Sequence, residues 1–165
     1  MHTHTFVHIV LATATASPGL ARAQPFPQIN IQGDTYASAC SAPPWQAVTL
    51  EIHKAAAGRH PELLTAVIKN FLCGTGEAAT LALHQSMPSS IEVISEETGT
   101  PGKRTSKRPR SEFSPLAGRA WQVSVQRTGA EVGLSYLPNE ACAAVVRFRY
   151  SANAWRMVGF GEACD

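Results

Sequence analysis

The fold is decided by the last stretch of the chain, residues 142–165, which reads CAAVVRFRYSANAWRMVGFGEACD. Apolar and polar side chains alternate on both sides of Ala152-Asn153-Ala154, a pattern typical of two antiparallel strands joined by a three-residue loop. This loop would place three pairs opposite one another: Cys142 with Cys164, Val146 with Phe160, and Phe148 with Val158. Opposed strand residues lie about 4.5 to 5.5 Å apart at Cα, within the span of a disulfide, so we predict a bond between Cys142 and Cys164.

The two remaining cysteines, Cys40 and Cys73, are then expected to form a second disulfide. No two cysteines have the C-x2-C spacing of zinc sites, and His53, His60 and His84 are not grouped near them, so we expect no metal site. In the chain-entropy model, loops of these lengths make each disulfide worth roughly 3 to 4 kcal/mol.

The first residues have the features of a secretory signal peptide. A short apolar run from Phe6 to Leu11 is followed by a Ser-Pro-Gly break, and then by Ala21-Arg22-Ala23, a pattern that signal peptidase accepts. We therefore predict a signal peptide over residues 1–23, a mature chain of residues 24–165, and a periplasmic or secreted protein. The apolar run is shorter than the ~20 residues that cross a bilayer, so we expect no integral membrane span.

Composition favours one domain without affinity for nucleic acid. The net charge is +2, which gives the protein no overall field that would select nucleic acid or membrane. The mature length suits a single domain of ordinary size.

Three segments of the first half have helical spacing of apolar residues. The first runs from Trp45 to Gly58, the second from Pro61 to Gly74, and a shorter third follows Thr75 and ends before Pro88. Residues 24–44 suggest an extended arm that Cys40 ties to the body. Residues 91–94 then predict a short strand.

A hairpin is expected before the final one. With a two-residue turn at Thr128-Gly129, an entirely apolar face forms from three pairs: Val125 with Val132, Val123 with Leu134, and Trp121 with Tyr136. The predicted fold is α+β, with two or three N-terminal helices packed on a curved antiparallel sheet of four or five strands. This order of elements resembles the cone-like folds of the nuclear transport factor 2 type, which serve many unrelated functions.

Two surfaces are candidates for binding. The first is the outer face of the last hairpin, for which we expect Arg147, Arg149, Trp155 and Met157, a composition enriched at interface centres. The alternative is that helices or the N-terminal arm cover this face. The second is a long polar segment, residues 96–117, expected to be a flexible loop. It either is merely solvated or reaches an acidic partner, a cell-wall polymer or lipid head groups. Its cations are Lys103, Arg104, Lys107, Arg108 and Arg110.

No enzyme motif for a serine elbow, a metalloprotease helix or a phosphate loop occurs, and we predict no catalytic residue and no cofactor. The combination of a signal peptide, two cysteine pairs, amphipathic helices and a small body resembles periplasmic immunity proteins that neutralise cell-wall amidase effectors of type VI secretion. The resemblance implies an inhibitor whose partner is a protein, such as a cell-wall hydrolase. The alternative is a small-ligand-binding or hydrolytic protein that uses the concave face of the sheet.

Overall fold

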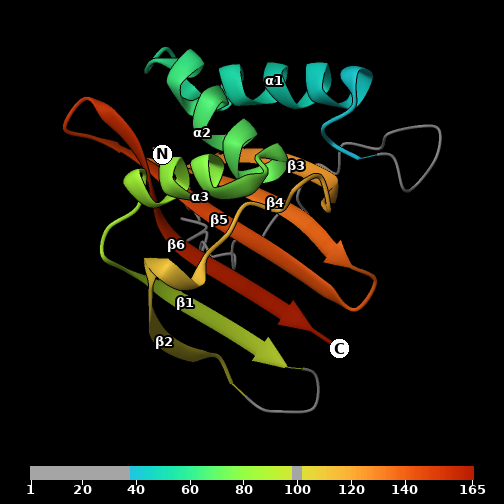
Figure 1. Cartoon of the computed structure of the whole chain (residues 1–165), viewed down its shortest axis with the longest axis vertical. Helices are drawn as coiled ribbons and strands as arrows, with labels where there is room; N and C mark the ends of the chain where they lie inside the picture. Colours follow the sequence, from blue (N-terminus) through green and yellow to red (C-terminus); the bar gives the residue numbers. More distant parts are fainter. Residues whose placement is uncertain (1–37, 98–101) are drawn as a thin grey trace, which may run out of the picture.

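The computed structural model describes residues 38–97 and 102–165, so the predicted signal peptide and most of the predicted arm lie outside the described residues. Three helices are followed by six strands and one short 3-10 helix (Figure 1). The helices are α1 (Ala42–Ala56), α2 (Pro61–Cys73) and α3 (Gly76–Gln85). The strands are β1 (Ser90–Glu97), β2 (Arg104–Pro109), β3 (Trp121–Thr128), β4 (Glu131–Asn139), β5 (Cys142–Ser151) and β6 (Ala154–Cys164), with η1 (Arg110–Glu112) after β2.

The helices begin and end close to where the sequence predicts. Prolines lie in the first turns of α1 and α2, where a missing N–H costs nothing. Ala57, with φ of 48°, ends α1 in the left-handed conformation, and Gly74 follows α2. All three predicted helices are therefore confirmed.

The six strands form one open, mixed sheet in the order β2-β1-β6-β5-β4-β3. Strand β1 runs parallel to β6, and every other pair is antiparallel. The helices lie on one side of this sheet (Figure 1). The α+β class is confirmed, but the prediction of four or five strands, all antiparallel, is wrong, because β1 joins the meander in parallel and β2 extends it.

Strand β2 lies in the segment that was expected to be a flexible loop. Its six residues are all exposed and pair with β1 in an antiparallel register. Strand prediction relies on apolar alternation, and an exposed edge strand made of Arg, Lys, Thr, Ser and Pro has none. The loop prediction is therefore wrong for residues 96–97, which end β1, and for residues 104–112.

The hairpin of β3 and β4 turns one residue later than predicted. Thr128 pairs with Glu131, so the turn is Gly129-Ala130, and Val125 lies opposite Leu134 instead of Val132. This shift of two positions keeps the side chains from Val123 onward on their expected faces, because side chains alternate with a period of two. The predicted pair of Trp121 with Tyr136 is wrong, because a bulge before Val123 turns Trp121 to the opposite face. A bulge near Gln122, with φ of 50°, places Trp121 opposite Leu137.

The hairpin of β5 and β6 holds both a confirmed pairing and an error. Cys142 lies opposite Cys164 and is bonded to it, and Val146 lies opposite Phe160, as predicted. The turn, however, is the two-residue Ala152-Asn153, both with positive φ, and a bulge follows on β6. Phe148 therefore pairs with Met157 and not with Val158.

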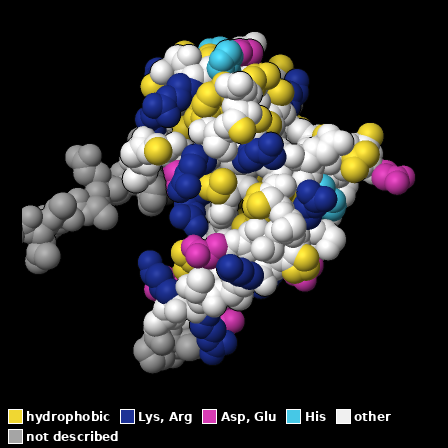
Figure 2. All heavy atoms as spheres, turned by 90° about the vertical axis from the view of Figure 1, so that its left-hand side faces the viewer, with side chains coloured by type: hydrophobic (Ala, Val, Ile, Leu, Met, Phe, Trp, Pro, Cys, Tyr) yellow, Lys and Arg dark blue, Asp and Glu magenta, His cyan; other side chains and the backbone are white. Residues whose placement is uncertain are grey.

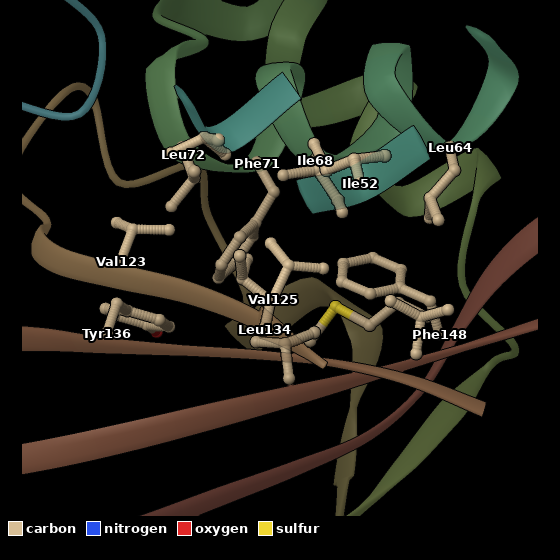
Figure 3. Packing of buried hydrophobic residues seen from close by; sticks show 14 of the residues in the cluster. Ile52, Leu64, Ile68, Phe71, Leu72, Val123, Val125, Leu134, Tyr136 and Phe148 are labelled. Atoms are coloured by element: carbon tan, nitrogen blue, oxygen red, sulfur yellow. The ribbon is translucent and has the colours of Figure 1, made fainter. Parts of the chain in front are cut away.

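The core lies between the helix layer and the sheet (Figure 3). Ile52, Leu64, Ile68, Phe71 and Leu72 point from the helices toward side chains of the strands. The strand side chains labelled there are Val123, Val125, Leu134, Tyr136 and Phe148. Each fully buried large apolar side chain contributes about 1.5 to 3 kcal/mol, so this layer holds the helices on the sheet.

The second disulfide joins Cys40 to the end of α2 at Cys73, as predicted, with Cα atoms 5.7 Å apart. Next to it, Ser38 donates a hydrogen bond to the backbone oxygen of Gly118 at 3.0 Å, and the N–H of Ala39 donates to Ala120. The start of the described chain is thus attached to both α2 and the segment that leads into β3.

Replacing both cysteines of either pair with serine should lower the free energy of unfolding by about 3 to 4 kcal/mol, because the unfolded chain regains loop entropy. The Cys40–Cys73 pair closes the longer loop, 33 residues against 22, and should cost slightly more. Urea unfolding followed by tryptophan fluorescence measures both. A loss below about 1 kcal/mol for either double variant would contradict the expectation.

Candidate functional site

A pocket of about 230 Å³ opens between the helix layer and the core side of the sheet. Its walls come from strands β2, β4 and β6, helix α2, η1 and the segment after η1. The lining residues are Phe71, Arg108, Glu112, Phe113, Ser114, Leu116, Tyr136, Phe160 and Glu162. Its volume lies below the ~300 to 1,000 Å³ typical of pockets for drug-sized ligands, so it suits a smaller molecule.

The charged groups of the pocket come from three elements. The guanidinium of Arg108 on β2 lies 4.0 Å from a carboxylate oxygen of Glu162 on β6. Glu112 of η1 supplies a second carboxylate to the lining. At 4.0 Å the Arg108 and Glu162 side chains are too far apart for a direct hydrogen bond, so both can still bond to a ligand.

Tyr136 provides a neutral hydroxyl among these charges. Burial raises the pKa of the Tyr136 phenol well above its ordinary value, and the negative charge of Glu162 adds to the shift. The phenol therefore stays protonated throughout the physiological range and can both donate and accept a hydrogen bond.

Aromatic rings form the apolar part of the pocket. Phe113 meets Phe160 edge to face with centroids 5.8 Å apart, and Phe71 meets Tyr136 in the same way at 5.8 Å. The segment that carries Phe113 is anchored, because Nε2 of His84 lies 2.9 Å from the backbone oxygen of Phe113. The N–H of Leu116 also donates to the backbone oxygen of Phe71 at 2.8 Å. These bonds keep the wall of the pocket in place.

Of the outer-face residues predicted from the sequence, Trp155 and Met157 lie elsewhere. Trp155 is 3% exposed and Met157 is fully buried in the core, and Nε1 of Trp155 donates to the backbone oxygen of Arg59 at 2.8 Å. The bulge on β6 is the physical reason, because one extra residue moves every side chain before it to the other face. Their expected place on the outer face is therefore wrong.

Arg147 and Arg149 do lie on the face without helices, where acidic neighbours pair with them. Arg147 contacts Glu92 at 3.4 Å and Glu131 at 3.6 Å, and Arg149 bonds to Glu131. Arg147 reaches Glu92 by lying across Gly159, where a Cβ atom would collide with the guanidinium. Most of the positive charge expected on this face is thus balanced.

The five predicted cations of residues 103–110 are all exposed. Because side chains alternate along β2, some of these cations lie on the helix-covered face of the sheet and others on the opposite face. Arg108 lies opposite the buried Ile91 and lines the pocket. Lys107 lies opposite Glu92 on the other face. Arg110 donates to the backbone oxygen of His84 at 3.3 Å.

Other groups of polar residues form weaker candidates. A hollow of about 650 Å³ beside the Cys142–Cys164 disulfide is lined by Glu96, Glu97, Glu140 and Asp165 but by no aromatic side chain. His60 and Glu62 are 3.1 Å apart, and both are well exposed. Glu62 has a lowered pKa, chiefly from its backbone hydrogen bond. Within the described parts of the chain, no group of acidic, histidine or cysteine side chains is arranged to hold a metal ion.

Sequence reasoning missed the pocket, although one signal was present. The predicted pairing of the last hairpin places Glu162 beside Ala144, on the face that carries Val146 and Phe148. A carboxylate on the core face of a strand is unusual, and it marks a candidate site. The aromatic walls gave no such signal, because Phe113 and Phe160 look like ordinary core residues.

No family model matches this chain, and no curated protein matches it. Among solved structures, an NTF2-like protein of unknown function from Silicibacter pomeroyi is 13% identical, with a TM-score of 0.44 over 66% of this chain and 98% of that one. A second, from Methylobacillus flagellatus, is 11% identical, with a TM-score of 0.34 over 78% and 98%. A DUF4783 family protein from Bacteroides fragilis is 10% identical, with a TM-score of 0.38 over 61% and 95%. Likenesses of this size carry no argument about function.

The shifted pKa of Tyr136 predicts a loss of stability at high pH. Above its ordinary value of 10, the phenol ionises in the unfolded chain but not in the folded one, so rising pH favours unfolding. The slope should approach about 1.4 kcal/mol per pH unit. Urea unfolding between about pH 9 and pH 11 measures it, and Tyr136→Phe should remove this part of the slope. An unchanged slope in the variant would refute the assignment.

Proposed function

We propose that this protein binds a small dipolar molecule with an apolar ring or branched chain in the pocket between the helices and the sheet. The main support for this proposal is the composition of the pocket lining. Aromatic side chains lie there beside two carboxylates and an arginine that is 4.0 Å from one of them. Pockets that bind small molecules combine mostly apolar walls with a few polar groups that fix orientation. This function corresponds to the small-ligand alternative considered for the sequence.

The charges of the pocket favour a ligand that carries both signs. Arg108 can bind a carboxylate, while Glu162 and Glu112 can bind an ammonium group. A ligand with only one charge would leave part of this set unpaired after displacing water, which costs free energy. An α-amino acid with an aromatic side chain satisfies both ends and fills the apolar part.

Two disulfides support an exported protein, because such bonds persist in oxidising compartments. Within the described residues, no helix is long and apolar enough to cross a bilayer. On the strength of the two disulfides, we propose that binding takes place outside the cytoplasm.

Three probes test the pocket by calorimetric titration: phenylalanine, phenylacetate and phenethylamine. Phenylalanine should bind most tightly, because it alone engages both charge types. Arg108→Met should weaken phenylalanine and phenylacetate about tenfold or more, and Glu162→Gln should weaken phenylalanine and phenethylamine similarly.

The matched control is Arg59→Met, which removes an exposed cation from the loop between α1 and α2 and should change no affinity. Circular dichroism confirms that each variant is folded. If none of the three probes binds, or if the two pocket variants bind all three as the wild type does, the proposed function is wrong.

A second candidate is an inhibitor of the immunity-protein kind that binds a cell-wall hydrolase. The supporting observation is the helix-free face of the sheet, where Arg149 keeps a side-chain exposure of 54% beside Glu131. Arg147 and Arg149 already form ion pairs with acidic side chains of this protein, and these pairs would have to break or rearrange when a partner binds. The pocket is therefore the stronger candidate.

Pull-down of the mature protein from its native envelope tests the second candidate. A partner bound through this face should be lost in the double variant Arg147→Glu and Arg149→Glu. The introduced carboxylates would repel the acidic groups of the partner that bind the arginines of the wild type. Arg59→Glu is the matched control. A partner retained by the double variant would rule out this face.

A further inference from the structure

We propose that the free edge of β2 binds an extended, acidic segment of another protein, which pairs with β2 as an additional strand. The inference goes beyond the ligand pocket and does not depend on it. It rests on two independent features of β2, the direction of its backbone groups and the charge of its side chains.

The backbone of β2 has hydrogen-bonding groups that point away from the sheet. β2 is the terminal strand, paired only with β1. The N–H of Arg110 donates to Ser89 at 3.0 Å, whereas Pro109 has no N–H to donate. Residues whose groups face the partner strand alternate with residues whose groups face away. The N–H and C=O groups of Thr105 and Lys107 therefore point outward.

The side chains of β2 are a dense strip of positive charge. Five of the eight residues from 103 to 110 are cations, and all five are exposed. Among the residues that the structure describes, their ion pairing is confined to the long contact of Arg108 with Glu162. Figure 2 shows Lys and Arg side chains over the lower part of this side of the molecule, where Figure 1 places β2.

These two features together select the partner. A second copy of β2 would bring like charges together, so the cations protect the edge against pairing with itself. A strand rich in Asp or Glu meets no such repulsion. Because side chains alternate along a strand, it would face Arg104 and Arg108 on one side and Lys103 and Lys107 on the other. Strand addition gives affinity through the main chain, and the charges give specificity.

The opposite edge of the sheet lacks this combination. Strand β3 has one cation, Arg127, and its guanidinium donates to the backbone oxygens of Ala55 and Ala56 at 3.1 and 3.3 Å. Arg127 thus holds the end of α1 on the sheet and is not presented to a partner. Charge complementarity with an acidic strand is therefore confined to the β2 edge.

The test uses fluorescence anisotropy and a fluorescein-labelled peptide, Thr-Glu-Val-Glu-Thr-Glu-Val-Glu-Thr. Its glutamates all lie on one side of an extended strand, where they can meet Lys103 and Lys107. The wild type should bind it, and salt should weaken the binding. Thr105→Pro removes one outward N–H but no bond to β1 and no charge, and should weaken binding about five- to tenfold. Lys103→Glu with Lys107→Glu should weaken it about tenfold or more.

Controls separate strand addition from simple attraction between charges. Arg59→Glu should leave the affinity unchanged. The same peptide with alternate amides N-methylated keeps its charge but cannot pair, and should not bind the wild type. The comparison of the two peptides uses only the wild-type protein. It therefore tests strand pairing even if Thr105→Pro fails to fold.

Two results would overturn the inference. One is the absence of binding to the unmodified peptide at low salt. The other is equal binding of the N-methylated peptide, which would make β2 a site for anionic polymers such as polyphosphate or wall polymer. The affinity of Thr105→Pro for phenylalanine, measured by calorimetric titration, should equal that of the wild type. The test of peptide binding at β2 is therefore independent of the test of ligand binding in the pocket.

Discussion

The pairing of β5 with β6 is the constraint on which the rest of the structure depends. It is the longest ladder of the sheet, it is closed at one end by the Cys142–Cys164 disulfide, and β6 also carries β1 on its other side. The register of this pair decides which side chains face the helices. If one of the two strands slipped by one residue, its core-facing side chains would turn toward solvent.

The bulge on β6 shows how one residue within that ladder changes both faces of the protein. It sends Trp155 and Met157 into the core, where they complete the packing under the helices. The outer face is left to Arg147, Arg149 and their acidic partners, with the flat backbone of Gly159 beneath Arg147. The molecule therefore has an outer face with paired charges, to which the bulge adds Arg156 opposite Arg149, and an apolar inner one.

Charged side chains depart from this division into a charged outer face and an apolar inner face at two places, the pocket and the edge strand β2. Glu162 and Arg108 project to the inner side, where burial would be costly without pairing or a ligand, and both retain access to water. Among the residues that the structure describes, the cations of β2 have one ion-pair contact, the long one of Arg108 with Glu162. Unbalanced polar groups at the margins of a satisfied core mark where a protein meets other molecules. For this reason, both proposals concern the β2 end of the sheet.

Sequence patterns alone predicted the three helices, both cysteine pairings, and the apolar faces of the two hairpins except beyond the bulges, where Trp121, Trp155 and Met157 change face. These features depend on spacings of a few residues and on a period of two that survives an error in turn position, as the β3 and β4 hairpin shows. Part of the site was also within reach, since Glu162 on a core-facing position departs from the pattern. Three features could not be predicted before the chain was folded: the bulge on β6, the parallel pairing of β1 with β6, and the existence of β2. Each of these arises from contacts between residues distant in the chain, and an exposed edge strand leaves no apolar period in its own sequence. The pocket belongs to the same group, because its walls come from segments that meet only when the sheet and helices are assembled.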